Sequence, residues 1–321
     1  MSVFAVAVAV AASAQAQEFP TKTVRIVSPY AAGGSDVLAR QLAERLSAKW
    51  KQPVIVENRP GASTNIAAKH VATSPADGHT LLFTSDATTT ANPHLFQDLF
   101  TKMAFDPVRD LSPVTQVVGF AFVVVAHPSL GVKTMAELLD KSRTSPVPIP
   151  YASFGNASQS HVFFEYMAAR HGLKLTQVPY KGVTPSMHAV IGGEVMLGLA
   201  GSGASVEFVK NGRLRALAIG GSSRSPSYPD VPTLTELGME DLDPKPWLGM
   251  YAPRGTSLEI RRKIANDVRE IIMDSASAKR YVVDLGYERK ASDPEDFEKH
   301  LARELVWRGE QIRLGKITAA E

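Results

Sequence analysis

The sequence predicts an α/β protein made of two lobes. Short runs rich in valine and isoleucine alternate with segments of helical periodicity, a pattern typical of βαβ units around a mainly parallel sheet. The chain has 321 residues, a length that suggests two domains, and 44% of them are hydrophobic, enough for two buried cores. We therefore expect two α/β lobes of comparable size with a small-ligand site between them.

The first lobe is predicted from the pattern between residues 23 and 85. A helix over 36–50 is indicated because its apolar residues share one face. These residues are Ala39, Leu42, Ala43, Leu46 and Trp50. The other expected elements are strands over 23–28, 53–57 and 80–85 and a helix that ends near residue 72.

The second lobe is predicted from a further alternation between residues 120 and 219. Thr134 and Glu137 have the spacing of a capping box at the start of a helix over 134–141. Gly172 closes a second helix over 160–171. The expected strands cover 120–126, 149–153, 175–180, 195–200 and 214–219.

The C-terminal part of the chain follows a stretch rich in Gly, Ser and Pro at 220–232. A strand over 247–252 leads into a helix that starts at Thr256. Asp293-Pro294 begins a last helix, with the aspartate as N-cap and the proline at the first helical position. Its residues expected to face the core are Phe297, Leu301 and Leu305.

The N-terminus has the composition of an export signal. Residues 3–12 form an uncharged apolar run, and Ala14 and Ala16 follow with the small-x-small spacing of a signal-peptidase site. The run is too short to cross a bilayer, which takes about 20 residues. No Lys or Arg precedes Lys22, so a basic start to the signal is missing. We predict an exported protein whose signal covers 1–16; the alternative is a buried N-terminal strand or helix.

The composition excludes several classes of function. The chain has no cysteine, which rules out disulfides, thiolate metal sites and a cysteine nucleophile. The formal net charge of +3 is small for this length, and no Lys/Arg run is present, so nucleic acid is not an expected partner. The motifs G-x-S-x-G, H-E-x-x-H, G-x-G-x-x-G and the P-loop are absent, and we expect no cofactor and no metal.

Four loops rich in Gly, Ser and Thr stand where predicted strands end. They cover residues 29–36, 85–90, 153–161 and 180–182. Backbone N–H groups at the start of a helix favour an anion such as a carboxylate. Each loop alone is typical of a turn with a helix cap, but four of them divided between two lobes predict a site that grips a carboxylate mainly with neutral donors, to which Lys181 adds charge.

Motifs along nearly the whole chain after the leader occur in the order of a known family. They include Val24-Arg25-Ile26-Val27, Val56-Glu57-Asn58-Arg59-Pro60-Gly61-Ala62, Asp77-Gly78-His79-Thr80-Leu81-Leu82, Val178-Pro179-Tyr180-Lys181-Gly182, Gly192-Gly193-Glu194-Val195, Val231-Pro232-Thr233 and Trp247-Leu248-Gly249. In these motifs the sequence resembles the substrate-binding receptors of tripartite tricarboxylate transporters, also called Bug receptors.

The resemblance implies a type 2 periplasmic binding-protein fold, in which two α/β lobes joined by crossing hinge strands close over a small carboxylate without catalysing a reaction. We expect a first lobe of 17–123 plus 251–321 and a second of 124–250. The implied location is the periplasm, and the implied partners are the carboxylate and the subunits of a membrane permease.

The carboxylate-binding loops of the family map onto four segments of this chain. The residues expected at the site, with Tyr30 and Phe154 beside the mapped loops, are Tyr30, Ala32, Gly33, Gly34, Ser35, Asp36, Ser85, Asp86, Ala87, Phe154, Gly155, Asn156, Ala157, Ser158, His161, Tyr180, Lys181 and Gly182.

The sequence departs from the family pattern at three places. The first loop is one residue shorter between its glycines and Asp36, Phe154 and Asn156 stand where small residues are common, and Met196 replaces the usual aspartate. We expect Phe154, Tyr30 and Met196 to favour an apolar or aromatic monocarboxylate over a citrate-like polyacid, because fewer polar groups remain to pair extra carboxylates.

Two alternatives to a transport receptor remain. One is a periplasmic sensor subunit with the same binding step, which would present its ligand to a signalling partner. The other is an exported hydrolase or isomerase that uses Ser158 with His161, or Asp86 with Lys181. No third orienting group is evident for such an enzyme in the sequence.

Overall fold

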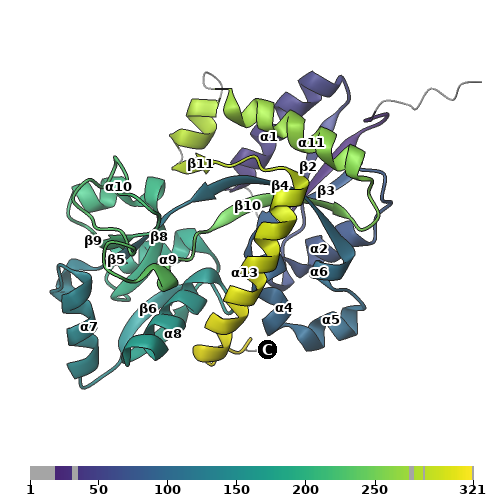
Figure 1. Cartoon of the computed structure of the whole chain (residues 1–321). Helices are drawn as coiled ribbons and strands as arrows, with labels where there is room; N and C mark the ends of the chain where they lie inside the picture. The colour runs from purple at the N-terminus through teal and green to yellow at the C-terminus, as the bar shows by residue number, and fades with distance from the viewer. Residues whose placement is uncertain (1–18, 31–34, 275–277, 285, 320–321) are drawn as a thin grey trace, which may run out of the picture.

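Two β-sheets with helices packed around them form the core of the protein (Figure 1). The structure is a computed structural model that describes residues 19–30, 35–274, 278–284 and 286–319. The predicted leader, 1–16, and three predicted site residues, Ala32, Gly33 and Gly34, lie outside the described residues. The predicted α/β class and two-lobe arrangement are confirmed.

The first sheet has the strand order β11-β4-β10-β3-β1-β2. β1 runs parallel to β2 and β3, whereas β10 is antiparallel to both β3 and β4. The strands are β1 (Val24–Ser28), β2 (Val54–Asn58), β3 (Thr80–Ser85), β4 (Leu111–Phe120), β10 (Trp247–Pro253) and β11 (Tyr287–Arg289).

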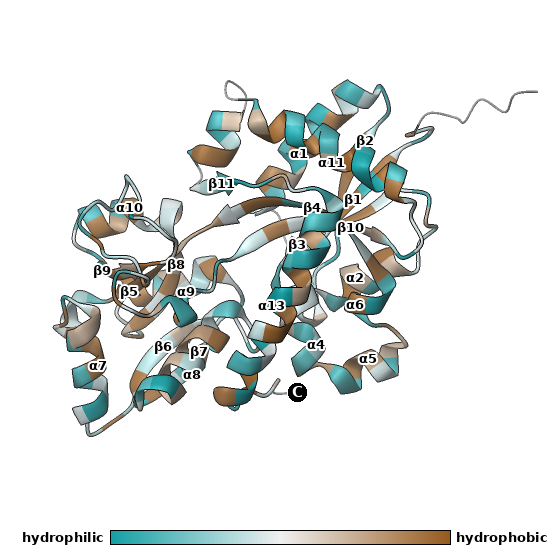
Figure 2. Cartoon of the chain, in the orientation of Figure 1, coloured by the Kyte–Doolittle hydropathy of each residue, from teal (hydrophilic) through white to brown (hydrophobic). Residues whose placement is uncertain are grey.

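Helices bury both faces of the first sheet. On one face, α1 (Ser35–Trp50) and α11 (Leu258–Met273) pack with the strands in one apolar core, which the predicted helical face of α1 joins as expected. On the other face, α2 (Asn65–Ala72) packs with Trp247, Tyr251 and Phe297. Figure 2 shows brown, apolar stretches in strands such as β5 and the alternation of brown and teal along the outer helices.

The second sheet has the strand order β7-β6-β8-β5-β9. β6 runs parallel to β7 and β8, and β5 is antiparallel to β8 and β9. The strands are β5 (Phe122–Ala126), β6 (Ile149–Ser153), β7 (Leu175–Pro179), β8 (Leu197–Gly201) and β9 (Arg215–Ile219). The helices around it are α7 (Met135–Thr144), α8 (Gln159–His171), α9 (Val183–Ile191) and α10 (Ser202–Lys210).

Two segments and one helix connect the lobes. A single residue, Ala121, separates β4 from β5, and residues 220–246 return the chain from β9 to β10. The last long helix, α13 (Pro294–Leu314), contacts β4 and α3 (Ala87–Thr90) in the first lobe and α8 in the second. Figure 1 shows α13 lying across both lobes. The predicted lobe limits at 123/124 and 250/251 remain a proposal.

The structure corrects the prediction around residues 86–126. The predicted strand 120–126 is the end of β4 followed by β5, and the body of β4 was not expected. The short helices before it were also missed. One of them, α3, has the sequence Ala-Thr-Thr-Thr, and its β-branched threonines disfavour helix formation. Hydrogen bonds to residues outside the helix fix it instead: Thr88 Oγ1 bonds to Thr84 and Thr64, and Thr89 Oγ1 bonds to Tyr251.

The helix caps follow the sequence closely. Thr134 accepts a hydrogen bond from Glu137 N at the start of α7, and Glu137 in turn accepts from Lys133 N. Gly172 ends α8 with a positive φ of 66°, a conformation that costs glycine little. Within the described ranges, no helix is both long and apolar enough to cross a membrane.

Candidate functional site

The predicted loops gather at the junction of the two sheets. Ser85, the last residue of β3, pairs with Leu248 at the start of β10, and Gly201, the last residue of β8, pairs with Phe122 directly after the crossover. Since β1 is parallel to β3, and β6 to β8, the carboxyl ends of all four strands lie at the crossover between the lobes. Loops from both lobes therefore face each other there, as in other two-lobed α/β proteins with ligands at this edge.

Direct contacts join the facing loops. The amide of Gln159, at the start of α8 in the second lobe, donates to the carboxylate of Asp86 in the first. On the other side of the crossover, Gly286 beside β11 approaches the backbone of α10 so closely that a Cβ atom at Gly286 would lie 2.8 Å from Gly203 N. This approach, at a φ of +80°, requires glycine at position 286.

In the first loop, Tyr30 points at the end of β3. Its hydroxyl accepts a hydrogen bond from Ser85 N at 2.9 Å and lies 3.5 Å from Thr84 Oγ1. Burial raises the pKa of Tyr30, so the hydroxyl stays protonated. Tyr30 thus fixes the position of the Ser85 backbone relative to the loop after β1.

Asp36 is 2% exposed and is engaged by two neighbours within its own lobe. Its carboxylate accepts from Asn58 Nδ2 at 2.7 Å and from Arg40 Nε at 2.8 Å. Asn58 Nδ2 also donates to Tyr30 O. The motif Asn58-Arg59-Pro60-Gly61 therefore contributes a side chain that ties the first loop to β2.

Asp86 is fully buried, and Arg308 of α13 lies 3.3 Å from its Oδ2 atom. Burial raises the pKa of Asp86 to about 6, against the opposing effects of Arg308 and Gln159. Ser85 and Ala87, on either side, are partly exposed. Asp86 thus fixes the buried side of this loop through its contacts with Arg308 and Gln159.

The loop after β6 is organised around Ser158. Ser158 is the N-cap of α8, and its hydroxyl donates to Gly155 O at 2.7 Å. Gly155 has a φ of +126°, and Ala157 adopts a left-handed conformation at 62°. Asn156 at the tip is exposed, and its side-chain oxygen accepts from Gln177. The loop is thus held from within by its own cap.

His161 supports the same loop through its ring. Nδ1 accepts a hydrogen bond from Ala157 N at 3.1 Å, which requires this nitrogen to be unprotonated. Burial lowers the pKa of His161, in agreement with a neutral ring. The Ser158 hydroxyl contacts the backbone of His161 at 3.4 Å, and its proton goes to Gly155 O.

The residue pairs of the hydrolase alternative are not assembled. The Ser158 hydroxyl would have to donate to the His161 ring, and both groups are used otherwise. Asp86 is paired with Arg308 and Gln159, and Lys181 is exposed. The structure thus gives neither pair a nucleophile–base contact.

The third predicted segment of the second lobe follows β7. Gly182 N donates to Phe154 O at 3.2 Å, which ties this segment to the loop after β6. The Tyr180 hydroxyl is 3.4 Å from Glu194 Oε2 and is turned to its own lobe. Lys181 is exposed to solvent.

Sequence reasoning missed an aromatic row at the crossover. Phe154 lies 5.4 Å from Phe122, Phe122 lies 5.3 Å from Phe120, and Phe120 lies 5.7 Å from Tyr287, each between ring centroids. We call Phe154, Phe122, Phe120 and Tyr287 the aromatic row. It runs from the second lobe to β11 of the first. Phe120 and Phe122 lie on either side of the crossover residue. The sequence prediction placed both in one continuous strand over 120–126, so the crossover between them was not expected.

Met196 does not belong to this region, which corrects the role expected for it. It precedes β8, whose first residue pairs with Ala126 at the end of β5 away from the crossover. Its sulfur is 3.7 Å from Ser129 Oγ. Met196 therefore cannot shape a site between the lobes.

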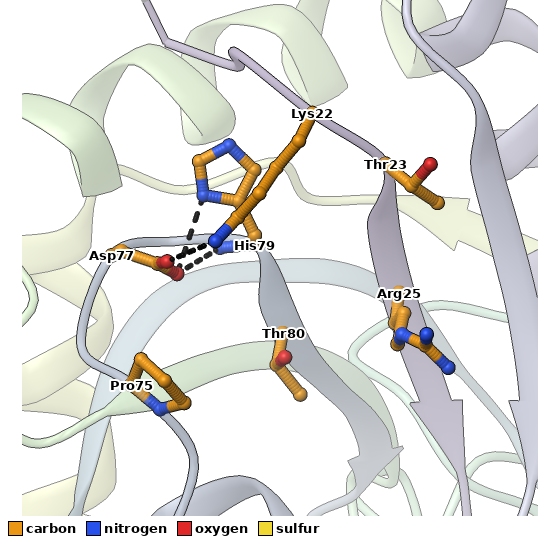
Figure 3. A pocket seen from close by; sticks show the side chains of 7 residues that line it. All are labelled: Lys22, Thr23, Arg25, Pro75, Asp77, His79 and Thr80. Carbon is orange, nitrogen blue, oxygen red and sulfur yellow. Dashed lines mark hydrogen bonds and ion pairs between the residues drawn. The ribbon is translucent and has the colours of Figure 1, made fainter.

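A surface pocket lies at the opposite edge of the first sheet (Figure 3). It is lined by residues at the amino ends of β1 and β3, including Lys22, Arg25 and His79. Lys22 Nζ is 2.9 Å from Asp77 Oδ2, His79 Nδ1 is 3.3 Å from Asp77 Oδ1, and Arg25 is paired with Glu57. The charges of Lys22 and Arg25 are thus paired with nearby carboxylates, and the pocket is remote from the loops of both lobes.

No cluster of potential metal ligands is found among the residues that the structure describes. The chemistry at the facing loops is that of hydroxyls, backbone amides, aromatic rings and a buried ion pair. This arrangement is suited to reversible binding.

Comparison with known proteins decides the family. Residues 38–315 match the model of the tripartite tricarboxylate transporter family receptor, TctC. The chain belongs to the TctC receptor family. Among the relatives of this TctC receptor is protein BugT of Bordetella pertussis, which is 32% identical over 277 residues, covering 86% of this chain and 84% of BugT.

Solved structures show the same fold. An R. palustris protein, Rpa4515, solved with adipate, superposes with a TM-score of 0.83 at 29% identity, over 94% of this chain and 99% of that one. MatC from Rhodopseudomonas palustris, solved with malate, gives a TM-score of 0.76 at 28% identity, over 92% and 100% of the two chains. The resemblance seen in the sequence motifs is thereby confirmed.

Proposed function

We propose that this TctC receptor captures a small carboxylate between its lobes in the periplasm and delivers it to a membrane permease. The observation that carries the proposal is the convergence of loops from both lobes at the carboxyl ends of β1, β3, β6 and β8. Family membership supports it, as do the carboxylates adipate and malate in two similar structures.

The ligand would be gripped mainly by neutral donors. The loops that hold Ser35, Ser85, Ala87, Gly155 to Ser158 and Gly182 supply these donors, and Ala32, Gly33 and Gly34 complete the first loop in this proposal. Ser85 N, Ala157 N and Gly182 N already bond within the protein, so these three groups fix the shape of the loops and do not bond to the ligand. Lys181 supplies charge from the solvent side. In this proposal the side chains of Tyr30, Asp86 and His161 do not bind the ligand directly but hold these loops in position.

Binding would act through closure of the lobes about Ala121 and the segment 220–246. A ligand stabilises the closed state only to the extent that it binds that state better than the open one. Contacts to loops of both lobes provide this difference, because both sets can be made at once only when the lobes are together.

The aromatic row favours a ligand with an apolar or aromatic body and one carboxylate. Its members Phe154, Phe120 and Tyr287 are partly buried and lie beside the loops at the crossover. A citrate-like polyacid would need polar partners for each further carboxylate, and aromatic rings cannot provide them. Residues 1–16 are proposed as the export signal, and 17–123 with 251–321 and 124–250 as the lobes.

A panel of carboxylates tests the ligand class. Benzoate, hexanoate, adipate, malate and citrate are titrated into the mature protein while its melting temperature is followed, because a ligand of the folded state raises stability with concentration. We expect benzoate or hexanoate to give the largest shift. Tight binding of citrate or malate without binding of monocarboxylates would contradict the preference, and no shift with any carboxylate would contradict the function.

Delivery to a permease is tested separately. The receptor is added to membrane vesicles that contain the cognate permease, and uptake of the radiolabelled carboxylate is measured. Uptake that depends on the receptor is expected. A receptor that binds the carboxylate without stimulating uptake would favour the sensor alternative.

A further inference from the structure

The C-terminal helix sends a buried arginine into the junction of the lobes. Arg308 is 1% exposed, although it stands eleven residues beyond Phe297, the residue through which α13 packs under the first sheet. A buried guanidinium is costly unless it is paired and hydrogen-bonded. Its partners therefore indicate why the fold retains it there.

The partners of Arg308 come from three separate parts of the chain. Nη2 lies 3.3 Å from Asp86 Oδ2 and 3.3 Å from Pro244 O in the segment that links β9 to β10. Nη1 donates to Gln311 Oε1 at 2.9 Å, and Gln311 Nε2 donates to Asp241 O at 3.0 Å. Arg308 thus joins the loop after β3 to the returning linker.

Asp86 extends this connection into the second lobe. The same Oδ2 atom that faces Arg308 accepts from Gln159, the first residue of α8. Ser158, the residue before it, caps α8 and orders the loop after β6. One carboxylate oxygen therefore fixes a candidate ligand loop of each lobe relative to the other.

An apolar cluster reinforces the same side of the junction. Ala91 of the first lobe and Val162 of α8 pack with Ile312 and Ile317 at the end of the C-terminal segment. The polar and the apolar contacts both arise because α13 packs against α3 of the first lobe and α8 of the second. The far ends of the two sheets, at β2 and β7, have no part in it.

We propose that Arg308 is a positioning residue for ligand binding: with Asp86 and Gln159 it forms a fixed pivot that sets the relative position of the ligand loops of the two lobes. This inference rests on the proposed receptor function. The lobes would rotate about the pivot and crossover, while the loops after β2 and β7 open and close. Arg308 itself does not touch the ligand.

The pivot is tested by measuring the distance between the lobes without ligand. The chain has no cysteine, so spin labels can be placed at Ser63→Cys, beyond β2, and Thr184→Cys, on α9 beyond β7, both exposed. Distance distributions from double electron–electron resonance are compared for the labelled parent, Arg308→Met, Gln159→Leu and Asp86→Asn. Arg313→Met, which changes an exposed arginine of the same helix, is the matched control.

We expect a narrow distribution for the parent and the Arg313→Met control, and a broadened or shifted one for the three pivot variants. The double variant Asp86→Asn with Arg308→Met separates positioning from stability. Removing both charges relieves the unpaired buried ion, so its melting temperature should recover while its distribution stays broad. If Arg308→Met does not fold, Gln159→Leu carries the test, since it leaves the ion pair in place.

Unchanged distributions in folded pivot variants, or a return to the parent distribution in the double variant, would overturn the pivot. Affinity gives a second readout with benzoate and adipate as probes, for which a loss of about tenfold in Arg308→Met and little change in Arg313→Met are expected. If neither probe nor any other carboxylate binds the parent, the proposed function fails. The ligand-free distances would still decide the pivot on their own.

Discussion

The phenolic oxygen of Tyr30 lies 2.9 Å from the backbone nitrogen of Ser85, so that the loop after β1 supports the loop after β3. The bond joins two of the segments that the proposed function assigns to the ligand. Tyr30 contacts a backbone group of β3, so the identity of the side chain at position 85 gives no indication of this bond. The geometry of one loop therefore depends on a side chain of the other.

Replacing Tyr30 by Phe should weaken ligand binding more than it weakens the fold. The change leaves Ser85 N without its acceptor, and the stability lost is expected to be about 1 kcal/mol. The dissociation constant should rise by roughly three- to tenfold because the loop is no longer fixed. Calorimetric titration and urea unfolding measure the two effects. Tyr151→Phe, which removes a hydroxyl bonded to Glu165 in the second lobe, should cost stability only.

Ser158→Ala removes the N-cap of α8 and its bond to Gly155 O. Loss of a cap of this kind lowers the free energy of unfolding by about 1 kcal/mol. The loop after β6, no longer held by the Ser158 hydroxyl, should also bind the ligand more weakly. Thr134→Ala removes the equivalent cap of α7, remote from the junction, and is the matched control. Equal affinity in both variants, measured by calorimetry, would show that the loop after β6 has no part in binding.

Phe154→Leu tests the role of the aromatic row. Loss of the ring removes its contact with Phe122 and should reduce affinity for benzoate more than for adipate, because the aliphatic acid has no ring to pack against it. Met196→Leu, at the far end of the second sheet, should change neither affinity. An equal loss for the two acids would mean that the row supports the fold and does not select the ligand.

Glu304 on α13 gives a prediction for pH. Burial raises the pKa of Glu304 from its ordinary 4.5 to about 7, with Arg308, Lys245 and Arg303 acting in the opposite direction and Asp86 adding to the rise. Because the folded protein then binds more protons than the unfolded chain between pH 4.5 and 7, the charged carboxylate destabilises the fold above pH 7.

The unfolding free energy of the parent should therefore rise relative to that of Glu304→Gln as pH falls from 8 to 4.5, by on the order of 2 kcal/mol. Urea unfolding at several pH values measures the difference between the two proteins. Glu298→Gln, at an exposed position of the same helix, is the matched control. A pH-independent difference for Glu304→Gln would show that its carboxyl titrates normally in the folded state.

The sequence predicted an element correctly where residues close together in the chain determine its structure. The strands over 80–85 and 149–153 have the predicted bounds, since short apolar runs end at clear turn signals. The caps at Thr134 and Gly172 also follow local rules. The threonine-rich α3 was missed because its stability comes from Thr84 and Tyr251, outside the helix.

The same limit applies to the candidate site. Asp86 could be placed on its loop from the sequence, but its partner Arg308 lies 222 residues away, and no local spacing connects them. The sequence placed Asp86 among the expected ligand residues, and that remains a prediction; the contacts of its Oδ2 atom with Gln159 and Arg308 could not be foreseen from local spacing. Phe120 and Tyr287 meet for a similar reason, through the pairing of β4 with β11.

The account rests on the claim that a small carboxylate binds between the lobes and uses loops of both. Calorimetric titration of the mature protein with benzoate, hexanoate, adipate and citrate, repeated with Ser158→Ala and Tyr30→Phe, tests it most directly. One carboxylate should bind the parent protein, and its affinity should fall in both variants, one from each lobe. Binding that is unchanged in both variants, or the absence of binding by any of the four acids, would contradict the claim.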